Sequence, residues 1–186
     1  MSIVSRIQSV TNAVRAKAHH LTDKGRMTLY RAPVPLPRKE FRDAGAVEIT
    51  TYAEIGAIPA AALRLLLPGR GREAARAEIA GKLERGERWV CLTRGGEPAC
   101  WLWAAPGASL PGWFVPLNAR DIVIYSVFTR YQFRGLGLAP RVIDHAADTL
   151  TDEGCMVVCG IALWNEPSIR AFAKLGFEPF ASIQLR

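Results

Sequence analysis

The sequence is poor in the features that mark membrane-spanning and disulfide-stabilised proteins. Among its 186 residues, no apolar run approaches the roughly 20 residues that a membrane-spanning helix needs. Four cysteines are present, and no two of them form a Cys-x-x-Cys pair: Cys91, Cys100, Cys155 and Cys159. We therefore expect neither a disulfide framework nor a metal site, but buried, reduced thiols in a cytoplasmic protein.

Acidic residues are scarce in the first quarter of the chain. Residues 1–46 contain nine Lys or Arg and three acids, whereas residues 47–186 contain fifteen and fourteen. Because the larger part is almost neutral, we expect no nucleic-acid partner. Residues 3–21 carry apolar residues at helical spacing with basic residues between them, which predicts an amphipathic helix. Such a helix packs on the domain or on a second copy in a homodimer, lies peripherally on an anionic membrane, or acts as a targeting segment.

The chain divides into two parts in this interpretation. Residues 1–45 form the basic helix and a proline-rich connector, with a short strand near residues 27–30, and residues 46–186 form the functional domain. Within that domain, apolar alternation and turn residues predict strands at residues 47–52, 88–94, 99–104, 122–129, 156–161 and 180–185. Helices are predicted at residues 59–67, 73–85, 138–150 and 166–175. This order predicts an α/β (α+β) fold, with helices on the faces of a mixed sheet.

Two phosphate-binding patterns are also missing. No Gly-x-x-x-x-Gly-Lys-Ser/Thr string occurs, which excludes a P-loop, and Pro140 stands where a Rossmann fingerprint has its third glycine. Residues 132–137, Gln-Phe-Arg-Gly-Leu-Gly, nevertheless place two glycines between a predicted strand and a predicted helix. Glycines at such a junction let backbone N–H groups face one anion at the helix N-terminus. The segment is a candidate pyrophosphate site.

Two motifs connect this turn to a known family. Gln132, Gly135 and Gly137 match the pattern Gln/Arg-x-x-Gly-x-Gly/Ala, and residues 165–177 contain an Asn, a small residue three positions on, an aromatic residue and then Lys-x-Gly-Phe. With both motifs in this order, the chain resembles the GNAT superfamily of N-acetyltransferases over about residues 120–180. The resemblance implies a GNAT-type, mostly antiparallel sheet of about six to seven strands flanked by helices, here with an extra N-terminal amphipathic helix. It also implies acetyl-CoA as acyl donor and direct attack on the thioester by a primary amine of a small molecule.

The resemblance further implies roles for individual residues. The backbone N–H groups of the turn would receive the CoA pyrophosphate beside the Arg134 cation, and the N–H of Phe128 would polarise the acyl carbonyl. Val127 and Thr129 would pair with the pantetheine arm, and Asn165 would hydrogen-bond the pantetheine or the reacting end. The implied cofactor-binding set is Val127, Phe128, Thr129, Gln132, Arg134, Gly135, Leu136, Gly137, Leu138, Asn165 and Phe172.

The candidates for the catalytic base are Asp121 and Tyr125. Both share strand parity with Val127 and Thr129, so all four are expected on one face of the sheet. Phe172 stands where many relatives carry a tyrosine thought to protonate the departing thiolate, and phenylalanine has no proton to give. This departure leaves a non-catalytic acyl-CoA-binding module as one alternative. A transferase for a longer acyl group, with the loop at residues 105–118 shaping the pocket, is another.

The acceptor and the end of the sheet are less defined. The near-neutral domain favours a small amine, and the basic N-terminal part suggests work at the cytoplasmic membrane face on an amino-sugar precursor of a surface polysaccharide. Trp101, Trp103, Trp113 and Phe114 are expected in the core and the pocket wall. Only nine residues follow Phe177, too few for the usual final hairpin of the family. The sheet is therefore expected to end in a single strand or to be completed by a partner chain.

Overall fold

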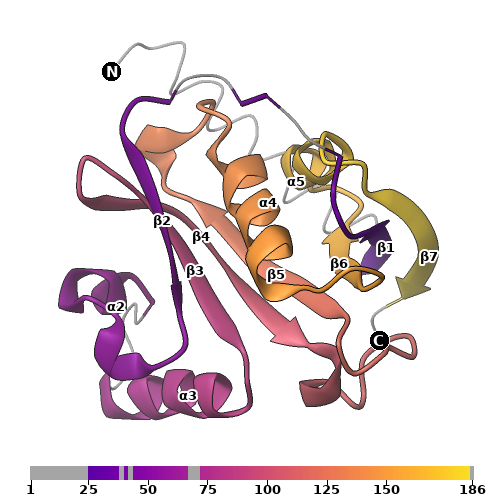
Figure 1. Cartoon of the computed structure of the whole chain (residues 1–186), viewed down its shortest axis with the longest axis horizontal. Coiled ribbons are helices and arrows are strands. Elements are labelled where there is room, and N and C mark those ends of the chain that lie inside the picture. The colour runs from indigo at the N-terminus through magenta and orange to yellow at the C-terminus, as the bar shows by residue number, and fades with distance from the viewer. Residues whose placement is uncertain (1–24, 38–39, 42–43, 67–71, 185–186) are drawn as a thin grey trace.

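A seven-stranded sheet organises the protein (Figure 1). The structure, a computed structural model, describes residues 25–37, 40–41, 44–66 and 72–184. The predicted helix at residues 3–21 lies outside these residues. In the described part of the chain, no helix is both long enough and apolar enough to span a membrane.

The sheet is mixed and mostly antiparallel, which confirms the predicted fold class. Its strands are β1 (Arg26–Pro33), β2 (Val47–Tyr52), β3 (Arg88–Arg94), β4 (Glu97–Pro106), β5 (Ile122–Thr129), β6 (Met156–Ala162) and β7 (Glu178–Gln184). They lie in the order β2-β3-β4-β5-β6-β1-β7. Every neighbouring pair is antiparallel except β5 and β6, which run parallel.

The helices lie on both faces of this sheet. In the described residues they are α2 (Ala60–Leu66), α3 (Arg72–Glu84), α4 (Leu138–Leu150) and α5 (Glu166–Ala173). Helix α4 packs across β2 to β5, and α5 lies beside it (Figure 1). The apolar stripe predicted for residues 138–150 is the face of α4 that meets the sheet, because Leu138, Val142 and Ala146 are all buried.

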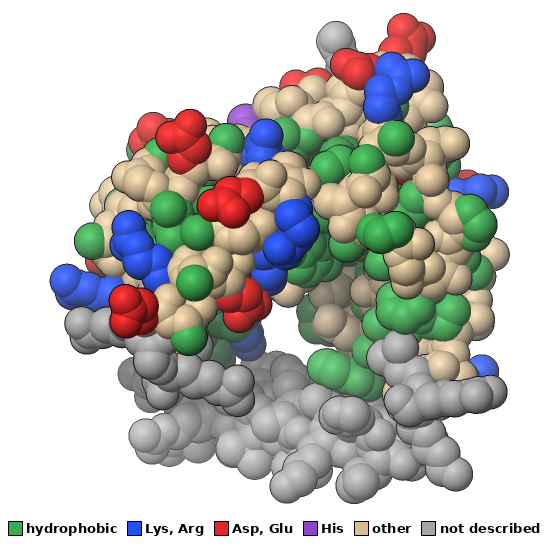
Figure 2. Space-filling model, turned by 90° about the horizontal axis from the view of Figure 1, so that it is seen from below, with side chains coloured by type: hydrophobic (Ala, Val, Ile, Leu, Met, Phe, Trp, Pro, Cys, Tyr) green, Lys and Arg blue, Asp and Glu red, His purple; other side chains and the backbone are tan. Residues whose placement is uncertain are grey.

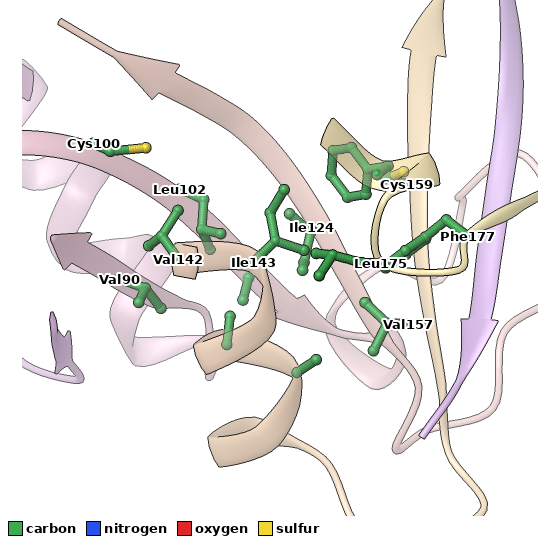
Figure 3. Close-up of a cluster of buried hydrophobic side chains, with 14 of the residues drawn as sticks. Val90, Cys100, Leu102, Ile124, Val142, Ile143, Val157, Cys159, Leu175 and Phe177 are labelled. Carbon is green, nitrogen blue, oxygen red and sulfur yellow. The ribbon is translucent and has the colours of Figure 1, made fainter. Parts of the chain in front are cut away.

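Alternate residues of the central strands feed two separate cores. On β3, Val90 and Leu92 belong to the main core under α4 and α5, part of which is shown in Figure 3. Trp89 and Cys91, which point to the opposite face, belong to a second core with α2 and α3. The second core is rich in tryptophan, because it contains Trp89, Trp101 and Trp103.

Strand β1 lies inside the sheet, between β6 and β7. The short strand predicted near residues 27–30 is confirmed, but the sheet begins at Arg26 rather than near residue 46. Tyr30 and Ala32 belong to the main core, and Leu29 has no exposed surface, so β1 is a buried strand of the sheet. The expectation that the sheet ends in a single strand is confirmed in the described residues, because β7 is the one strand after α5 and forms an edge of the sheet, with the chain's own β1 as its inner neighbour. The position of β1 inside the sheet could not be predicted from the sequence, because no local pattern shows which strands an N-terminal segment will pair with.

The segment after β1 also packs against the domain. The N–H of Val34 donates to the carbonyl of Cys155 at 3.1 Å, and Leu36 and Phe41 lie against the main core. The Arg94 side chain holds the segment just before β2, since its Nε donates to the Ala44 carbonyl at 2.7 Å. The described part of the proline-rich stretch is therefore an integral cover of the core.

Candidate active site

Strands β5 and β6 separate soon after they meet. They pair only at Ile122 with Val157 and at Val123 with Val158. Strand β4, on the other side of β5, continues to pair with it as far as Thr129. The β6-facing backbone edge of β5 beyond Val123 is therefore open, and this is the edge along which the family resemblance places the pantetheine arm. An open edge of this kind can pair with an extended ligand.

A bulge at Ser126 turns the end of β5. Among the described residues, Ser126 is the one non-glycine residue with a positive φ, at 51°. At the same place the pairing of β4 with β5 shifts register, between Trp101 and Trp103. Tyr125 lies against the tryptophan-rich core, whereas Val127, two residues later, packs against the main core. The expectation that Tyr125 shares a face with Val127 and Thr129 is wrong, because the extra residue reverses the alternation. Sequence alternation could not show this, since serine is not a residue that marks such a bulge.

Phe128 lies on the face of the sheet that regular alternation would give to Val127 and Thr129. Its ring centroid lies 4.8 Å from that of Trp101, with 31° between the planes. The side chain is 45% exposed, which is unusual for phenylalanine and leaves one part of the ring facing solvent. The bulge thus puts Phe128 on the same face as Tyr125.

The glycine turn forms an exposed approach to α4. Gly135 and Gly137 have φ values of +83° and +71°, which favour glycine, and a Cβ at either would meet nothing within 4 Å. Gly137 occupies the N-cap position, where its lack of a side chain leaves the first turn of α4 uncovered. The space beside the turn is therefore open to a diphosphate group, and the residues fit such a group.

Other members of the predicted set surround this turn. Arg134 is exposed, and its Nε donates to the Thr129 carbonyl at 3.2 Å, which holds the guanidinium at the end of β5. Gln132 is exposed and Leu136 is half-buried. Leu138 is 1% exposed and points into the main core, so only its backbone N–H remains available to a ligand.

An open cavity of about 650 Å³ adjoins the end of β5 and the start of the turn. Its lining comes from α2, β4, β5 and the residues just after β5: Leu65, Leu66, Trp101, Trp103, Ser126, Val127, Phe128, Arg130, Tyr131 and Gln132. Trp101 and Trp103 are thus part of both the core and the cavity wall. The same expectation for Trp113 and Phe114 is wrong, because these two rings pack on each other, with centroids 5.6 Å apart, outside both described cores and this cavity. The described lining of this cavity includes no residue of the 105–118 loop, and a role of that loop in shaping an acyl pocket stays a prediction. Figure 2 shows the molecule from below, relative to the view of Figure 1. In this view the molecule is hollowed between two lobes, and hydrophobic side chains gather along the hollow.

A buried carboxylate lies next to Tyr125. The Tyr125 hydroxyl donates to Glu87, whose side chain is 4% exposed. Burial, together with this carboxylate, raises the pKa of the Tyr125 hydroxyl well above its usual value, so the group is protonated at neutral pH. The second carboxylate oxygen of Glu87 is 3.0 Å from Nη2 of Arg85, which balances the charge. Glu87 was not predicted, because a lone acid between a turn and a strand carries no pattern.

Asp121 lies apart from these groups, at the start of β5. Its Oδ2 accepts the N–H of Asn118 at 2.8 Å, and its Oδ1 accepts the N–H of Met156 at 3.0 Å. The residue is 5% exposed. The structure therefore gives Asp121 the position of an anchor that ties the loop before β5 to the start of β6.

The second motif is divided between a helix cap and the core. Asn165 Oδ1 accepts the N–H of Ser168 at 3.3 Å, which makes Asn165 the N-cap of α5. Phe172 is 2% exposed and meets Phe177 edge to face, with ring centroids 4.9 Å apart. Its ring thus lies in the main core and not at the surface of the glycine turn.

Comparison with known proteins agrees with this fold. The acetyltransferase (GNAT) family matches residues 64–177. The chain belongs to this family, and its membership supports acyltransferase activity. No curated protein matches the chain in a sequence search.

Solved structures share the fold at low sequence identity. A GNAT-family acetyltransferase from Colwellia psychrerythraea is 17% identical, with a TM-score of 0.56 over 86% of this chain and 54% of that one. A tandem GNAT protein from the clavulanic acid biosynthesis pathway is 16% identical, with a TM-score of 0.58 over 86% and 52%. The chain thus spans about half the length of these two relatives. AAC(6')-Iy, solved with the bisubstrate analog CoA-S-monomethyl-acetylneamine, is 16% identical, with a TM-score of 0.52 over 76% and 95%.

Proposed function

We propose that the protein transfers an acetyl group from acetyl-CoA to a primary amine of a small molecule. The observation that carries this proposal is the glycine turn, which opens the N-terminus of α4 beside the free edge of β5. A helix N-terminus preceded by glycines is suited to a diphosphate, and an open strand edge is suited to the amide groups of pantetheine. Family membership makes CoA the diphosphate ligand to expect.

In this proposal, the residues of the turn hold the donor. The N–H groups of residues 134–138 receive the pyrophosphate, and the Arg134 guanidinium adds a charge-assisted contact. The backbone of Val127 and Thr129 pairs with the pantetheine arm, and Asn165 offers its amide near the reacting end. The N–H of Phe128, at the bulge, polarises the acyl carbonyl. Bound acetyl-CoA supplies a thioester whose carbonyl carbon accepts the amine nitrogen, with the CoA thiolate as leaving group.

The proton of the attacking amine needs an acceptor. We assign this role to Glu87 acting through Tyr125: the amine proton passes to the Tyr125 oxygen while the Tyr125 proton passes to the Glu87 carboxylate. Because the raised pKa disfavours a free tyrosinate, the two transfers are concerted. Asp121 does not receive this role, since both of its oxygens accept backbone N–H groups at the far end of β5.

The donor site is tested by adding a side chain to the turn. Gly135→Glu places a carboxylate where the pyrophosphate would lie, and we expect calorimetric CoA affinity to fall by at least about 100-fold. Gly95→Glu is the matched control, because Gly95 has a φ of +58°, lies in the β3–β4 turn and also has open space around its Cβ position. Equal CoA affinity in the two variants would mean that the glycine turn is not the donor site.

The transferase step is tested by thiol release from acetyl-CoA in the presence of amines. Release that depends on the amine supports the proposal. Tight CoA binding with no release for any amine would instead identify a non-catalytic acyl-CoA-binding module. A cytoplasmic location, a homodimer and contact of residues 3–21 with a membrane stay predictions.

A further inference from the structure

The cavity beside the donor edge is mostly apolar. Six of its lining residues have apolar side chains, and they come from three different elements: Leu65, Leu66, Trp101, Trp103, Val127 and Phe128. Ser126, Tyr131 and Gln132 are polar but uncharged, and Arg130 is the charged residue of the described lining. None of the described lining residues is acidic. A site for a polycationic acceptor would need carboxylates here, because each buried ammonium requires a partner.

The tryptophans make the cavity wall rigid. Trp101 is 8% exposed and Trp103 is 5% exposed, so neither can swing away without opening the second core. Trp101 is held between Trp89, at a centroid distance of 6.5 Å, and Phe128, at 4.8 Å. Flat aromatic surfaces that are fixed in advance bind another ring or a branched alkyl group with little loss of side-chain freedom.

The two cations nearest the cavity wall are each paired with a carboxylate, Lys82 with Glu78 at 3.7 Å and Arg130 with Glu97 at 3.2 Å. Lys82 Nζ lies 5.0 Å from the Trp103 ring centroid and 5.4 Å from that of Tyr125. Arg130 reaches Glu97 at 3.2 Å and the Pro98 carbonyl at 3.1 Å, so its guanidinium is held in place. The buried Glu87 carboxylate is already paired with Arg85. These three carboxylates are thus already engaged by the chain's own cations and are poor partners for a ligand with several ammonium groups, and the apolar wall lowers the pKa of a single bound amine. The neutral amine is the form that attacks a thioester.

We infer that the acceptor is a monoamine with an aromatic or branched alkyl body, and that Trp101, Trp103 and Phe128 recognise this body. The inference rests on the proposed acetyl transfer and names its substrate class. It replaces the amino-sugar precursor suggested by the sequence, because a sugar would lose water from many hydroxyl groups in a cavity with few hydrogen-bonding partners. Since Phe128 is also the residue whose N–H faces the acyl carbonyl in the proposal, a body packed on its ring keeps the amine near the reacting carbon.

Binding is measured first, independently of turnover. Phenethylamine and glucosamine are titrated into the full chain, and tryptophan fluorescence is recorded. We expect phenethylamine to bind at least about tenfold tighter and to perturb the fluorescence of the cavity tryptophans. Glucosamine binding as tightly as phenethylamine, or no binding of phenethylamine, would overturn the inference even if the protein proves to be an acetyltransferase.

A pair of exposed phenylalanines gives a matched control. Phe128 is 45% exposed and lines the cavity, whereas Phe114 is 49% exposed and does not. Phe128→Ala should weaken phenethylamine binding about tenfold, while Phe114→Ala leaves it unchanged. Equal binding in both variants would contradict the inference. Thiol release with the same amines is then measured: tight phenethylamine binding without release in any assay would refute the proposed function, yet leave the ligand class of the cavity supported.

Discussion

Replacing Leu29 by alanine tests whether β1 is a structural strand of the sheet. Leu29 is fully buried, and it pairs with Gly160 of β6 and Ala181 of β7. A Cβ built on Gly160 would lie 3.4 Å from Leu29 Cδ2, so the leucine fills space that the glycine leaves free. Neither neighbour is large enough to refill that space. Leu→Ala at such a site costs about 2–5 kcal/mol, and about 3 kcal/mol would lower the Tm of a chain of this size by about 6–12 °C.

The assay is thermal unfolding of the full chain by calorimetry, with Arg31→Ala as control. Arg31 is an exposed residue of the same strand, and its guanidinium lies 5.0 Å from the Phe180 ring centroid. We expect this control to change the free energy of unfolding by about 0.5 kcal/mol or less. If Leu29→Ala costs no more than Arg31→Ala, β1 is not packed between β6 and β7 in solution, and the described strand order is refuted.

Three further predictions concern the site and the thiols. Asp121→Asn should cost about 2–3 kcal/mol in stability, because the new NH₂ group faces a backbone N–H. The kcat of the folded protein should be unchanged. A large loss of kcat in a fully folded variant would restore Asp121 as the base. Tyr125→Phe should lower kcat about 100-fold without changing CoA affinity, because Glu87 loses its link to the amine, and steady-state kinetics beside CoA titration decide this. Burial raises the pKa of Cys91 to about 12 and that of Cys100 to about 11, from 9.0. Above about pH 9 the unfolded thiols lose protons that the folded ones keep, so the free energy of unfolding should fall by up to about 1.4 kcal/mol per pH unit per thiol. The measurement is urea unfolding at about pH 8 and about pH 10, on the natural chain and on a Cys91→Ala, Cys100→Ala double variant. If the free energy of unfolding fell equally in both proteins, the two thiols would not be the cause.

Local features of the fold could be predicted closely from the sequence. The strand predicted at residues 122–129 and the helix predicted at residues 138–150 have the bounds of β5 and α4. Both are defined by apolar periodicity and by the glycine turn between them, which are properties of adjacent residues. The Asn165 cap of α5 was predictable for the same reason, since a cap requires only its own helix.

Features that depend on distant residues could not be predicted. The bulge at Ser126 arises where β4 and β5 shift register, so it depends on how two strands align. It moved Tyr125 away from Val127, and the family motifs carried no sign of it. Glu87 becomes notable only when folding buries it against Tyr125, from which it is 38 residues away in sequence. The cavity has the same origin, because its wall joins a helix to two strands and a turn.

The position of β1 also has a consequence for how the protein is made. Arg26 pairs with Gln184, so β1 finds its outer neighbour in residues that are synthesised much later than β1 itself. At roughly 5–20 residues per second, on the order of ten seconds pass before that neighbour exists. During this interval the hairpin of β3 and β4 can already form, whereas Leu29 and Ala32 remain without their burial partners. The β6-β1-β7 part of the sheet is therefore completed only after β7 has been synthesised, and a nascent chain stalled before β6 would expose an apolar strand for chaperones to bind.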